Sequence, residues 1–401
     1  MAMDYDIVVV GAGPSGSMAA KYASKQGAKT ALLEEHYAIG EPVQCAGLVS
    51  VACLKECEIE PDSHFVNHKI RGAFFYSPDC KSIKIEGNDE NEVKDYVIER
   101  RLFDRVLAQK AVKSGAELIL NSKVVGIRRE GKKQVLDIIC DDGHVEMTCG
   151  VVIGADGLKS KVAKLSGLGN VKKILPGAQI EGLYEPEDPN FVEMFTGRDV
   201  APGFFLWSIP TGDGLARIGL CSTCSSLDFL EKNLTSHPVI SKRFNGSVTD
   251  FVVGAVPIGP LKRTISDGVM IVGDAAGQVK PTSGGGVYTG VICAKIAGEV
   301  AAKAVIEGDT GVKGLSEYEK RWRSEIGQEL KIGMLVHRAF ERWGDKDLND
   351  FVSLLSEPEI LDLMAEYGDV DHPSILIRKF FRVLTLSRLI KVLKIGINAL
   401  I

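Results

Sequence analysis

A glycine-rich turn near the N-terminus restricts the possible folds of this chain more strongly than any other segment. Residues 5–10, YDIVVV, form a short apolar run that stops at the turn 11–16, GAGPSG. Such a run is typical of a strand buried within a parallel sheet. Residues 17–25 then favour a helix, and residues 29–33 favour a second strand that leads into two glutamates. The order strand, glycine turn, helix, strand predicts a βαβ unit.

The spacing of the glycines in this turn predicts a binding site for a dinucleotide. Gly11 allows the tight turn, Gly13 lets the backbone approach a pyrophosphate, and Gly16 lets the helix pack closely on the strand. Amide groups at the start of the helix, where Ser15 lies, are donors for phosphate. Glu34 follows Gly16 by 18 residues and is placed to hydrogen-bond a ribose.

Two later segments repeat the pattern of an apolar strand followed by a glycine turn. Residues 151–153 lead into a GADG turn at 154–157, and residues 269–272 lead into a GDAA turn at 273–276. An Ala-rich helix is expected soon after the last turn, at residues 287–306. An aspartate at the end of a strand, followed by glycines that open a helix, suits a polyol chain with an electron-rich ring over the helix N-terminus.

The periodicity of the other segments completes the predicted fold, which is α/β with an inserted sheet and C-terminal helices. Residues 64–96 and 172–262 alternate between apolar and polar and are rich in β-branched and aromatic residues, which favours an antiparallel sheet that forms a substrate domain. Residues 315–401 have a helical pattern throughout. A Rossmann-like nucleotide-binding domain is then expected to be discontinuous, with residues 1–63, 97–171 and 263–314.

Charge, cysteine usage and hydropathy exclude several classes of protein. The net charge of −5 argues against nucleic acid as a partner, because counterion release needs a broad basic surface. Nine cysteines without framework spacing, and no leader peptide, indicate a reducing, cytoplasmic compartment. No apolar run reaches the roughly 18–20 residues of a membrane-spanning helix. A single CxxC at 221–224 lacks the second pair of a zinc site, so no metal site is predicted.

The three glycine turns together resemble those of a known family. In order and spacing, the turns at 11–16, 154–157 and 273–276 are similar to the motifs of the p-hydroxybenzoate hydroxylase-like flavoproteins, which include the geranylgeranyl reductases. The resemblance implies FAD as the cofactor. Glu34 then matches the ligand of the adenosine ribose, and Asp274 matches the ligand of the ribityl chain.

The same resemblance implies further cofactor contacts. Gly286 and Val287 match backbone donors near the flavin O2 atom, where negative charge collects on reduction. Arg100 matches the arginine of the family's R-x-x-F-D motif beside the cofactor, and the adjacent Arg101 is the alternative match. Val124 matches a backbone contact to adenine.

Two segments resemble one branch of the family, the archaeal geranylgeranyl reductases. PVQCAG at 42–47 is similar to their P-V-x-C-x-G segment, which lies against the isoalloxazine ring. This similarity places Cys45, Ala46 and Gly47 beside the cofactor. KPTSGGGV at 280–287 is similar to their P-x-T-G-G-G-I motif, with an extra or shifted serine.

A rigid apolar segment, PGFFLWSIP at 202–210, resembles the P-x-x-Y-x-W-x-F-P signature that lines the lipid cavity of these reductases. Phe205 replaces the family's Tyr and Ile209 replaces its Phe, whereas Trp207 matches. These three residues are expected to hold a prenyl chain by apolar burial, since such a chain offers no hydrogen-bonding group. Two alternatives stay open: the segment is also close to the W-x-W-x-I-P of flavin-dependent halogenases, and it fits plain core between the sheet and the FAD domain.

The resemblance implies an FAD-dependent reductase that saturates isolated C=C bonds of geranylgeranyl chains in precursors of archaeal ether phospholipids. Cys45 is the candidate for the proton donor or for a group that orients the substrate. Because the chain has no second dinucleotide fingerprint, the electron donor is expected to be a ferredoxin-like carrier or NAD(P)H. Two other functions compete with this hypothesis, an aromatic hydroxylase or halogenase on the same scaffold and a non-catalytic prenyl-lipid carrier.

The C-terminal segment 374–401 carries six Lys or Arg and no acid, with apolar residues between them at helical spacing. A basic amphipathic helix of this kind binds anionic membrane surfaces at about 1 kcal/mol per cation. A helix that packs on the body of the protein is the alternative. The sequence therefore predicts a cytoplasmic protein. If the segment is a membrane-binding helix, the protein also associates with the inner face of the cell membrane.

Overall fold

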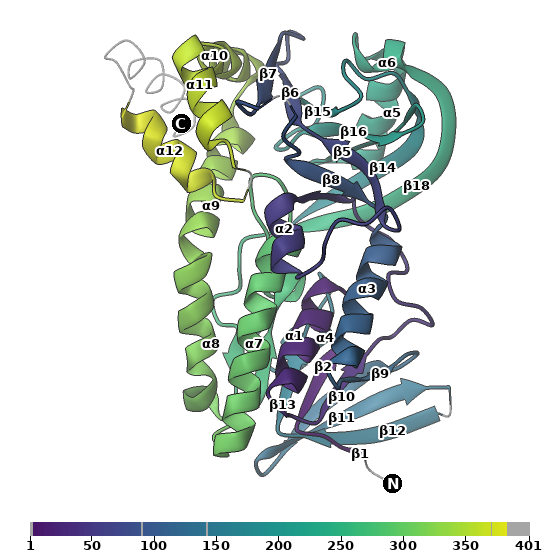
Figure 1. Cartoon of the computed structure of the whole chain (residues 1–401), viewed down its shortest axis with the longest axis vertical. Helices are drawn as coiled ribbons and strands as arrows, with labels where there is room; N and C mark the ends of the chain where they lie inside the picture. The colour runs from purple at the N-terminus through teal and green to yellow at the C-terminus, as the bar shows by residue number, and fades with distance from the viewer. Residues whose placement is uncertain (1–2, 90, 142, 370, 383–401) are drawn as a thin grey trace.

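The computed structural model describes residues 3–89, 91–141, 143–369 and 371–382. The molecule is elongated, with two halves along its long axis (Figure 1). The N-terminal glycine turn and the nucleotide-binding sheet lie in the lower half, and a larger sheet lies in the upper half. The C-terminal helices run along one side and reach both halves (Figure 1).

The nucleotide-binding sheet has six strands in the order β19-β20-β13-β2-β3-β9. Its neighbouring strands are parallel except for β19 and β20. The central strands are buried along their whole length, as their continuous apolar runs predict. The predicted βαβ unit is thus confirmed. The strands are β2 (Ile7–Val10), β3 (Thr30–Leu33), β9 (Glu117–Ile119), β13 (Val151–Gly154), β19 (Ile265–Ser266) and β20 (Val269–Ile271).

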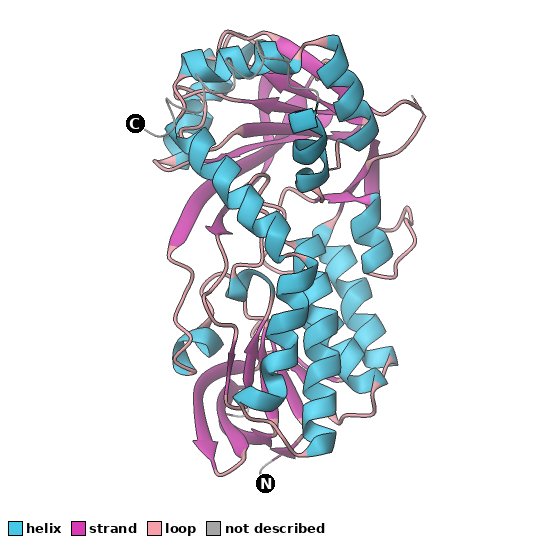
Figure 2. Cartoon of the chain, turned by 90° about the vertical axis from the view of Figure 1, so that its left-hand side faces the viewer, coloured by secondary structure: helices cyan, strands magenta, loops and turns pink. Residues whose placement is uncertain are grey.

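Different layers cover the two faces of this sheet. On one face lie α1 (Pro14–Lys25), α3 (Arg100–Lys113) and α7 (Val287–Glu307), joined by an Ala-rich core. Figure 2 shows this helical layer beside the strands of the lower half. A four-stranded sheet covers the other face. Its strands are β1 (Met3–Asp4), β10 (Lys123–Glu130), β11 (Lys133–Cys140) and β12 (Gly143–Cys149).

The upper half is built on a seven-stranded sheet in the order β18-β14-β17-β16-β15-β6-β7. The inserted sheet is antiparallel as predicted, except that β6 and β15 run parallel. Helices α5 (Ser226–Ser236) and α6 (Ile240–Arg243) cover one of its faces. The strands are β6 (Gly72–Tyr76), β7 (Ser82–Glu86), β14 (Lys173–Tyr184), β15 (Phe191–Phe195), β16 (Leu206–Gly212), β17 (Leu215–Cys221) and β18 (Phe244–Ile258).

A small three-stranded sheet lies between the two halves (Figure 1). It consists of β4 (Leu48–Ser50), β8 (Asp95–Ile98) and β5 (Val66–Ile70), with β8 in the centre. Two of the strands in 64–96 therefore join β4 rather than the large sheet. Helix α2 (Val51–Glu56) follows β4 directly, and the Ser50 hydroxyl caps it by accepting from the Cys53 amide at 2.9 Å.

The C-terminal region is helical as far as the structure describes it. Its helices are α8 (Val312–Glu325), α9 (Gly327–Arg342), α10 (Asp345–Leu355), α11 (Pro358–Tyr367) and α12 (Pro373–Arg382). The predicted amphipathic segment 374–401 is described only to Arg382, and residues 383–401 lie outside the described part of the chain. Among the described residues, no helix is both long enough and apolar enough to cross a membrane.

Candidate active site

The glycine turn after β2 is packed against the backbone of neighbouring segments. An added Cβ at Gly16 would lie 1.7 Å from the carbonyl oxygen of Gly11, and one at Gly11 would lie 2.5 Å from that of Ala155. Only glycine fits these positions, so α1 can start close to β2 and β13. A Cβ at Gly13, in contrast, meets no atom within 4 Å. Gly13 lines a cavity, where the absence of a side chain lets a ligand approach the backbone.

Glu34 lies just after β3, next to the glycine turn. Its carboxylate accepts a hydrogen bond from the Ala12 amide at 2.9 Å and lies 2.6 Å from His36 Nδ1. The Ser122 amide donates to the Glu34 carbonyl oxygen at 2.7 Å. This bond places the start of β10, with the buried Val124, beside Glu34. These contacts hold the Glu34 carboxylate at the end of β3, and Glu34 is the residue predicted to hydrogen-bond the ribose.

The turn after β20 forms another wall of the same cavity. Asp274 lies in a short 3-10 helix (Gly273–Ala276), and Gly286 and Val287 are at the start of α7. An added Cβ at Gly286 would lie 2.7 Å from Asp274 Oδ1, so the aspartate is next to the helix N-terminus. Burial raises the pKa of Asp274, and the nearby Arg100 opposes this shift. A carboxylate can accept hydrogen bonds from the hydroxyl groups of a polyol chain, and the amides at the start of the helix can donate to an anionic ring attached to that chain.

Ser15 packs where the two turns meet. An added Cβ at Gly273 or Gly290 would lie 2.5 Å from Ser15 Oγ, so both positions need glycine for the turns to meet. The cavity between the turns, called the cofactor cavity below, has a volume of about 260 Å³. Of the residues predicted to bind the cofactor, its wall includes Gly13, Ser15, Cys45, Arg100, Asp274, Gly286 and Val287. The open space at Gly13, two helix N-termini and Asp274 fit a molecule with a pyrophosphate and a polyol.

Of the two adjacent arginines, Arg100 is the one in the cavity wall. Its guanidinium makes two hydrogen bonds of 3.1 Å to Asp104, which lies one turn further along α3. The Cys45 sulfur also interacts with this guanidinium. Burial lowers the pKa of Arg100, but Asp104 and Cys45 outweigh this effect and hold the pKa above its usual range. Arg101 instead pairs at 3.5 Å with Glu41, and its side chain is 49% exposed.

The Cys45-Ala46-Gly47 segment is held in place by a residue that the sequence interpretation missed. Arg217 on β17 is buried and donates to the carbonyl oxygens of Ala46 at 2.9 Å and Ile98 at 3.0 Å. An added Cβ at Gly47, where φ is +75°, would lie 2.2 Å from Arg217 Nη1. Arg217 also pairs with Glu181 at 2.9 Å. In the sequence, the one indication of this role was a charged residue among the apolar positions of β17.

The apolar segment 202–210 lines a second cavity, called the apolar cavity below, with a volume of about 350 Å³. Phe205, Trp207 and Ile209 all contribute to its wall. Phe205 and Ile209 are buried and Trp207 is half-buried. Trp207 Nε1 donates to Gln179 at 3.0 Å, and its ring packs edge-on against Phe205 at 6.2 Å between centroids. The segment is therefore part of the core and also the wall of a cavity.

The two cavities share one wall. The residues that line both are Gln44, Cys45, Leu48, Ser50, Ala255, Val256, Lys280, Gly284 and Gly285. A group bound in the apolar cavity therefore lies against the part of the cofactor cavity that is next to the 42–47 and 280–287 segments. Ligands bound in the two cavities would therefore lie next to each other.

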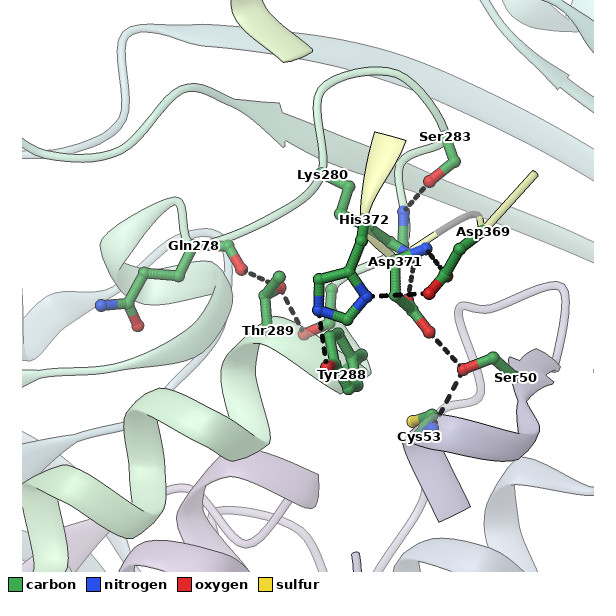
Figure 3. A network of polar contacts seen from close by, with 12 residues as sticks. Ser50, Cys53, Gln278, Lys280, Ser283, Tyr288, Thr289, Asp369, Asp371 and His372 are labelled. Atoms are coloured by element: carbon green, nitrogen blue, oxygen red, sulfur yellow. Dashed lines mark hydrogen bonds and ion pairs between the residues drawn. The ribbon is translucent and has the colours of Figure 1, made fainter. Parts of the chain in front are cut away.

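A charged cluster that the sequence interpretation did not identify lies at this shared wall (Figure 3). Lys280 pairs with Asp371, and both side chains are nearly inaccessible to solvent. The Ser50 hydroxyl also donates to Asp371. Asp369 accepts from the Asp371 amide at 2.7 Å and lies 2.8 Å from His372 Nδ1 (Figure 3). The loop before α12 thus reaches the site from a distant part of the sequence.

Comparison with known proteins agrees with this geometry. Residues 6–191 match the model of a family described as FAD dependent oxidoreductase. The digeranylgeranylglycerophospholipid reductase of Methanothrix thermoacetophila is 38% identical over 375 residues, which cover 89% of this chain and 93% of that protein. The chain belongs to the digeranylgeranylglycerophospholipid reductase family. FAD is therefore its cofactor, and the chain is an oxidoreductase of the CH–CH class.

Other members of the family match over similar lengths. The reductase of the same name from Methanocaldococcus jannaschii is 35% identical, with 88% of this chain and 91% of that protein covered. An uncharacterized protein of the same organism is 34% identical over 98% of both chains.

Solved structures support the fold. A geranylgeranyl bacteriochlorophyll reductase-like protein from Thermoplasma acidophilum superimposes with a TM-score of 0.84 at 26% identity and covers 96% of this chain and 100% of that chain. The p-nitrophenol 4-monooxygenase of Pseudomonas putida superimposes with a TM-score of 0.72 at 17% identity, over 95% of this chain and 98% of that chain. This second similarity shows the shared fold alone.

Proposed function

We propose that this protein is an FAD-dependent reductase that saturates isolated C=C bonds of geranylgeranyl chains in the glycerophospholipid precursors of archaeal membranes. The observation that carries the proposal is the apolar cavity of about 350 Å³ that shares a wall with the cofactor cavity. Bound FAD, once reduced, supplies a hydride to carbon. The names of the relatives support the choice of lipid.

The chain's own residues have separate roles in this proposal. Phe205, Trp207 and Ile209 bind the prenyl chain by burying its apolar surface, at about 25 cal/mol per Å². Arg217 holds the backbone of the Cys45-Ala46-Gly47 segment through its hydrogen bond to Ala46, and this segment would lie beside the ring of bound FAD. Cys45 lies in the shared wall and is placed to orient an alkene there. The residues proposed to hold FAD are Gly11, Gly13, Ser15, Gly16, Glu34, Cys45, Ala46, Gly47, Arg100, Val124, Asp274, Gly286 and Val287.

The decisive experiment is an anaerobic turnover assay. The purified flavoprotein is reduced with dithionite and mixed with a digeranylgeranyl glycerophospholipid, and the product is analysed by mass spectrometry. The proposal expects reoxidation of the flavin and a gain of two hydrogens for each bond reduced. If the lipid leaves the reduced flavin unchanged, while aromatic compounds accelerate oxygen consumption, the hydroxylase or halogenase alternative is correct. Purified protein without flavin would instead favour the lipid carrier.

We further propose a ferredoxin-like carrier or NAD(P)H as the electron donor. The cofactor cavity carries the dinucleotide motif, and the sequence has no second copy of it. Anaerobic bleaching of the flavin absorbance by each donor separates the two possibilities. The faster donor at equal concentration identifies the physiological class.

We also propose that the protein associates with the inner face of the cell membrane through its C-terminal segment. Within the described residues, α12 is basic and amphipathic, and its start is fixed to α9 because the Ser374 amide donates to Glu329 at 3.0 Å. A chain shortened to end at Arg382 keeps this attachment but loses three of the six cations. It should co-sediment less with anionic vesicles than the full chain does. Equal co-sedimentation would remove the anchor hypothesis.

A further inference from the structure

Reduction of an alkene consumes a proton, and the wall of the apolar cavity contains carboxylic acids that could supply it. Asp95, at the start of β8, is half-buried and lines the apolar cavity. Glu86 lines the same cavity, but it forms an ion pair with Lys84 at 2.7 Å and is 35% exposed. Both residues are half-buried, and Glu86 is the one whose carboxylate is engaged in an ion pair.

The sheet register places Asp95 next to the shared wall. Ser50 on β4 lies directly opposite Asp95 on β8. The adjacent pair is hydrogen-bonded, because the Val51 amide donates to the Lys94 carbonyl oxygen at 3.1 Å. Ser50 and Asp95 are thus a non-hydrogen-bonded pair, in which the Cα atoms are about 4.5 Å apart and the side chains are close on one face. Since Ser50 lines both cavities, Asp95 is beside the place where they meet.

The charges around Asp95 come from three segments. Asp371 and Asp369 act on it from the loop before α12, Lys280 from the 280–287 segment, and Lys94 from the position just before β8. Burial is the largest effect and raises the pKa of Asp95, the negative charge of Asp371 raises it further, and Lys280 opposes both. The result is a pKa of about 7. At neutral pH a large fraction of this carboxyl group carries a proton.

We propose that Asp95 is the general acid of the reduction and that the hydrogen-bonded pair Ser50 and Asp371 conducts a proton back to it. This inference rests on the proposed function. In the step, the π bond of the alkene breaks, one carbon gains the hydride from the reduced cofactor, and the other gains the proton of the Asp95 carboxyl. The cofactor loses two electrons, and Asp95 is left as a carboxylate.

The return of a proton has a structural route. Asp371 accepts from the Ser50 hydroxyl on the side of Asp95. Asp371 and His372 also line a separate polar cavity of about 320 Å³. His372 is 39% exposed and contacts Tyr288 Oη through Nε2 at 3.3 Å. Ser50 lines the apolar cavity together with Asp95, whereas Asp371 lines the cofactor cavity. Both act on the alkene through Asp95, so they are positioning residues in this scheme.

Replacement of Asp95 by Asn tests the proposal directly. The amide has the shape of the protonated acid but donates no proton, so the rate of flavin reoxidation by the prenyl lipid in a single turnover should fall by roughly 100-fold or more. In the wild type this rate should decrease as pH rises through about 7, because the protonated acid is the active form. Asp95→Asn should lose that decrease, and Asp95→Glu should recover part of the rate.

Two measurements keep this test independent of folding and of the proposed function. The FAD content of Asp95→Asn should equal that of wild type, and a protonated-carboxyl infrared band that titrates near pH 7 should be missing from it. Glu92→Gln removes an exposed carboxylate from the same chain segment and should change neither the rate nor the band. Full activity of Asp95→Asn, with an active wild type, would overturn the proposal, whereas an inactive wild type would refute the proposed function instead.

Asp371→Asn gives a second readout that a purely structural role would not produce. It removes the negative charge that raises the pKa of Asp95 and leaves in place the Lys280 charge, which lowers that pKa. The midpoint of the single-turnover pH–rate profile should therefore move to lower pH, and repeated turnover should slow because an amide at position 371 cannot return a proton to Asp95. An unmoved midpoint would assign the titration to another group and overturn the proposal.

Discussion

The cofactor cavity and the apolar cavity adjoin, but their walls are made of different parts of the chain. The cofactor cavity is bounded by glycine turns and by the first turns of α1 and α7, so main-chain atoms form much of its surface. The apolar cavity is bounded mainly by residues of the large and the small sheet, and the side chains in its wall include Phe205, Trp207 and Ile209. An added methyl group collides where main-chain segments pack on each other, as at Gly11 and Gly16, whereas a wall of side chains can be enlarged by a single truncation. Mutations in the two cavities should therefore fail in different ways.

The broadest effect, on both FAD binding and folding, is expected at Gly16 in the glycine turn beside the cofactor cavity. An added methyl group would lie 1.7 Å from the Gly11 carbonyl oxygen, a distance that forces the turn to move. Gly16→Ala should therefore lose both FAD and stability, with a decrease of about 1–3 kcal/mol or more in the free energy of unfolding. Flavin absorbance and thermal melting of the purified protein measure the two losses.

Gly13→Ala is the matched control for this prediction. Its methyl group would meet no protein atom within 4 Å, so the melting temperature of the FAD-free protein should hardly change. Affinity for FAD should still fall, because the methyl group occupies the space where the pyrophosphate approaches the backbone. If Gly13→Ala bound FAD as tightly as wild type, the pyrophosphate would have to lie elsewhere.

A smaller and more selective effect is expected at Trp207 in the apolar cavity. Loss of its contacts with a prenyl chain should cost about 1.5–3 kcal/mol of binding in the transition state. Trp207→Ala should thus lower kcat/KM on the lipid roughly tenfold to a hundredfold. The FAD content should stay close to that of wild type, because Trp207 lines the apolar cavity and not the cofactor cavity.

Leu206→Ala, at the neighbouring position, is the control that distinguishes the loss of a core contact from the loss of a contact in the apolar cavity. Leu206 points to the opposite face of β16, where it is fully buried with the residues of α5. Its truncation should lower the free energy of unfolding by about 2–5 kcal/mol and leave lipid turnover of the folded fraction unchanged. Equal losses of FAD and turnover in Trp207→Ala would mean that Trp207 is plain core.

The same contrast explains how much the sequence could predict. Close approach of main-chain atoms requires glycine at fixed spacing, so Gly11, Gly13 and Gly16 are visible as a motif within a few residues. The alternation of apolar and polar residues likewise predicted the inserted sheet. One parallel pair, β6 with β15, was missed, because periodicity reports which face of a strand is buried and carries no information on strand direction.

The charged part of the site could not be predicted, because its residues meet only in the folded chain. Ser50, Asp95, Lys280 and Asp371 come from four distant segments, and each is an ordinary polar residue in its own surroundings. Arg217 is a partial exception, since a charge within the apolar run of β17 hinted at a buried role. Motifs thus identified the cofactor, whereas the acid and its partners required the three-dimensional arrangement.

The smallest effect is expected at Cys45, which lies in the wall between the two cavities. Its sulfur accepts a hydrogen bond from the Gly47 amide at 3.3 Å and interacts with the Arg100 guanidinium. A serine oxygen can accept from the same donors, so Cys45→Ser should keep its FAD content and change the single-turnover rate only a few-fold. The pH at which that rate falls should also stay where it is, because Asp95 would still be the acid. A rate as low as that of Asp95→Asn would instead make the thiol the proton donor, and the carboxyl group would then serve only to support the wall behind it.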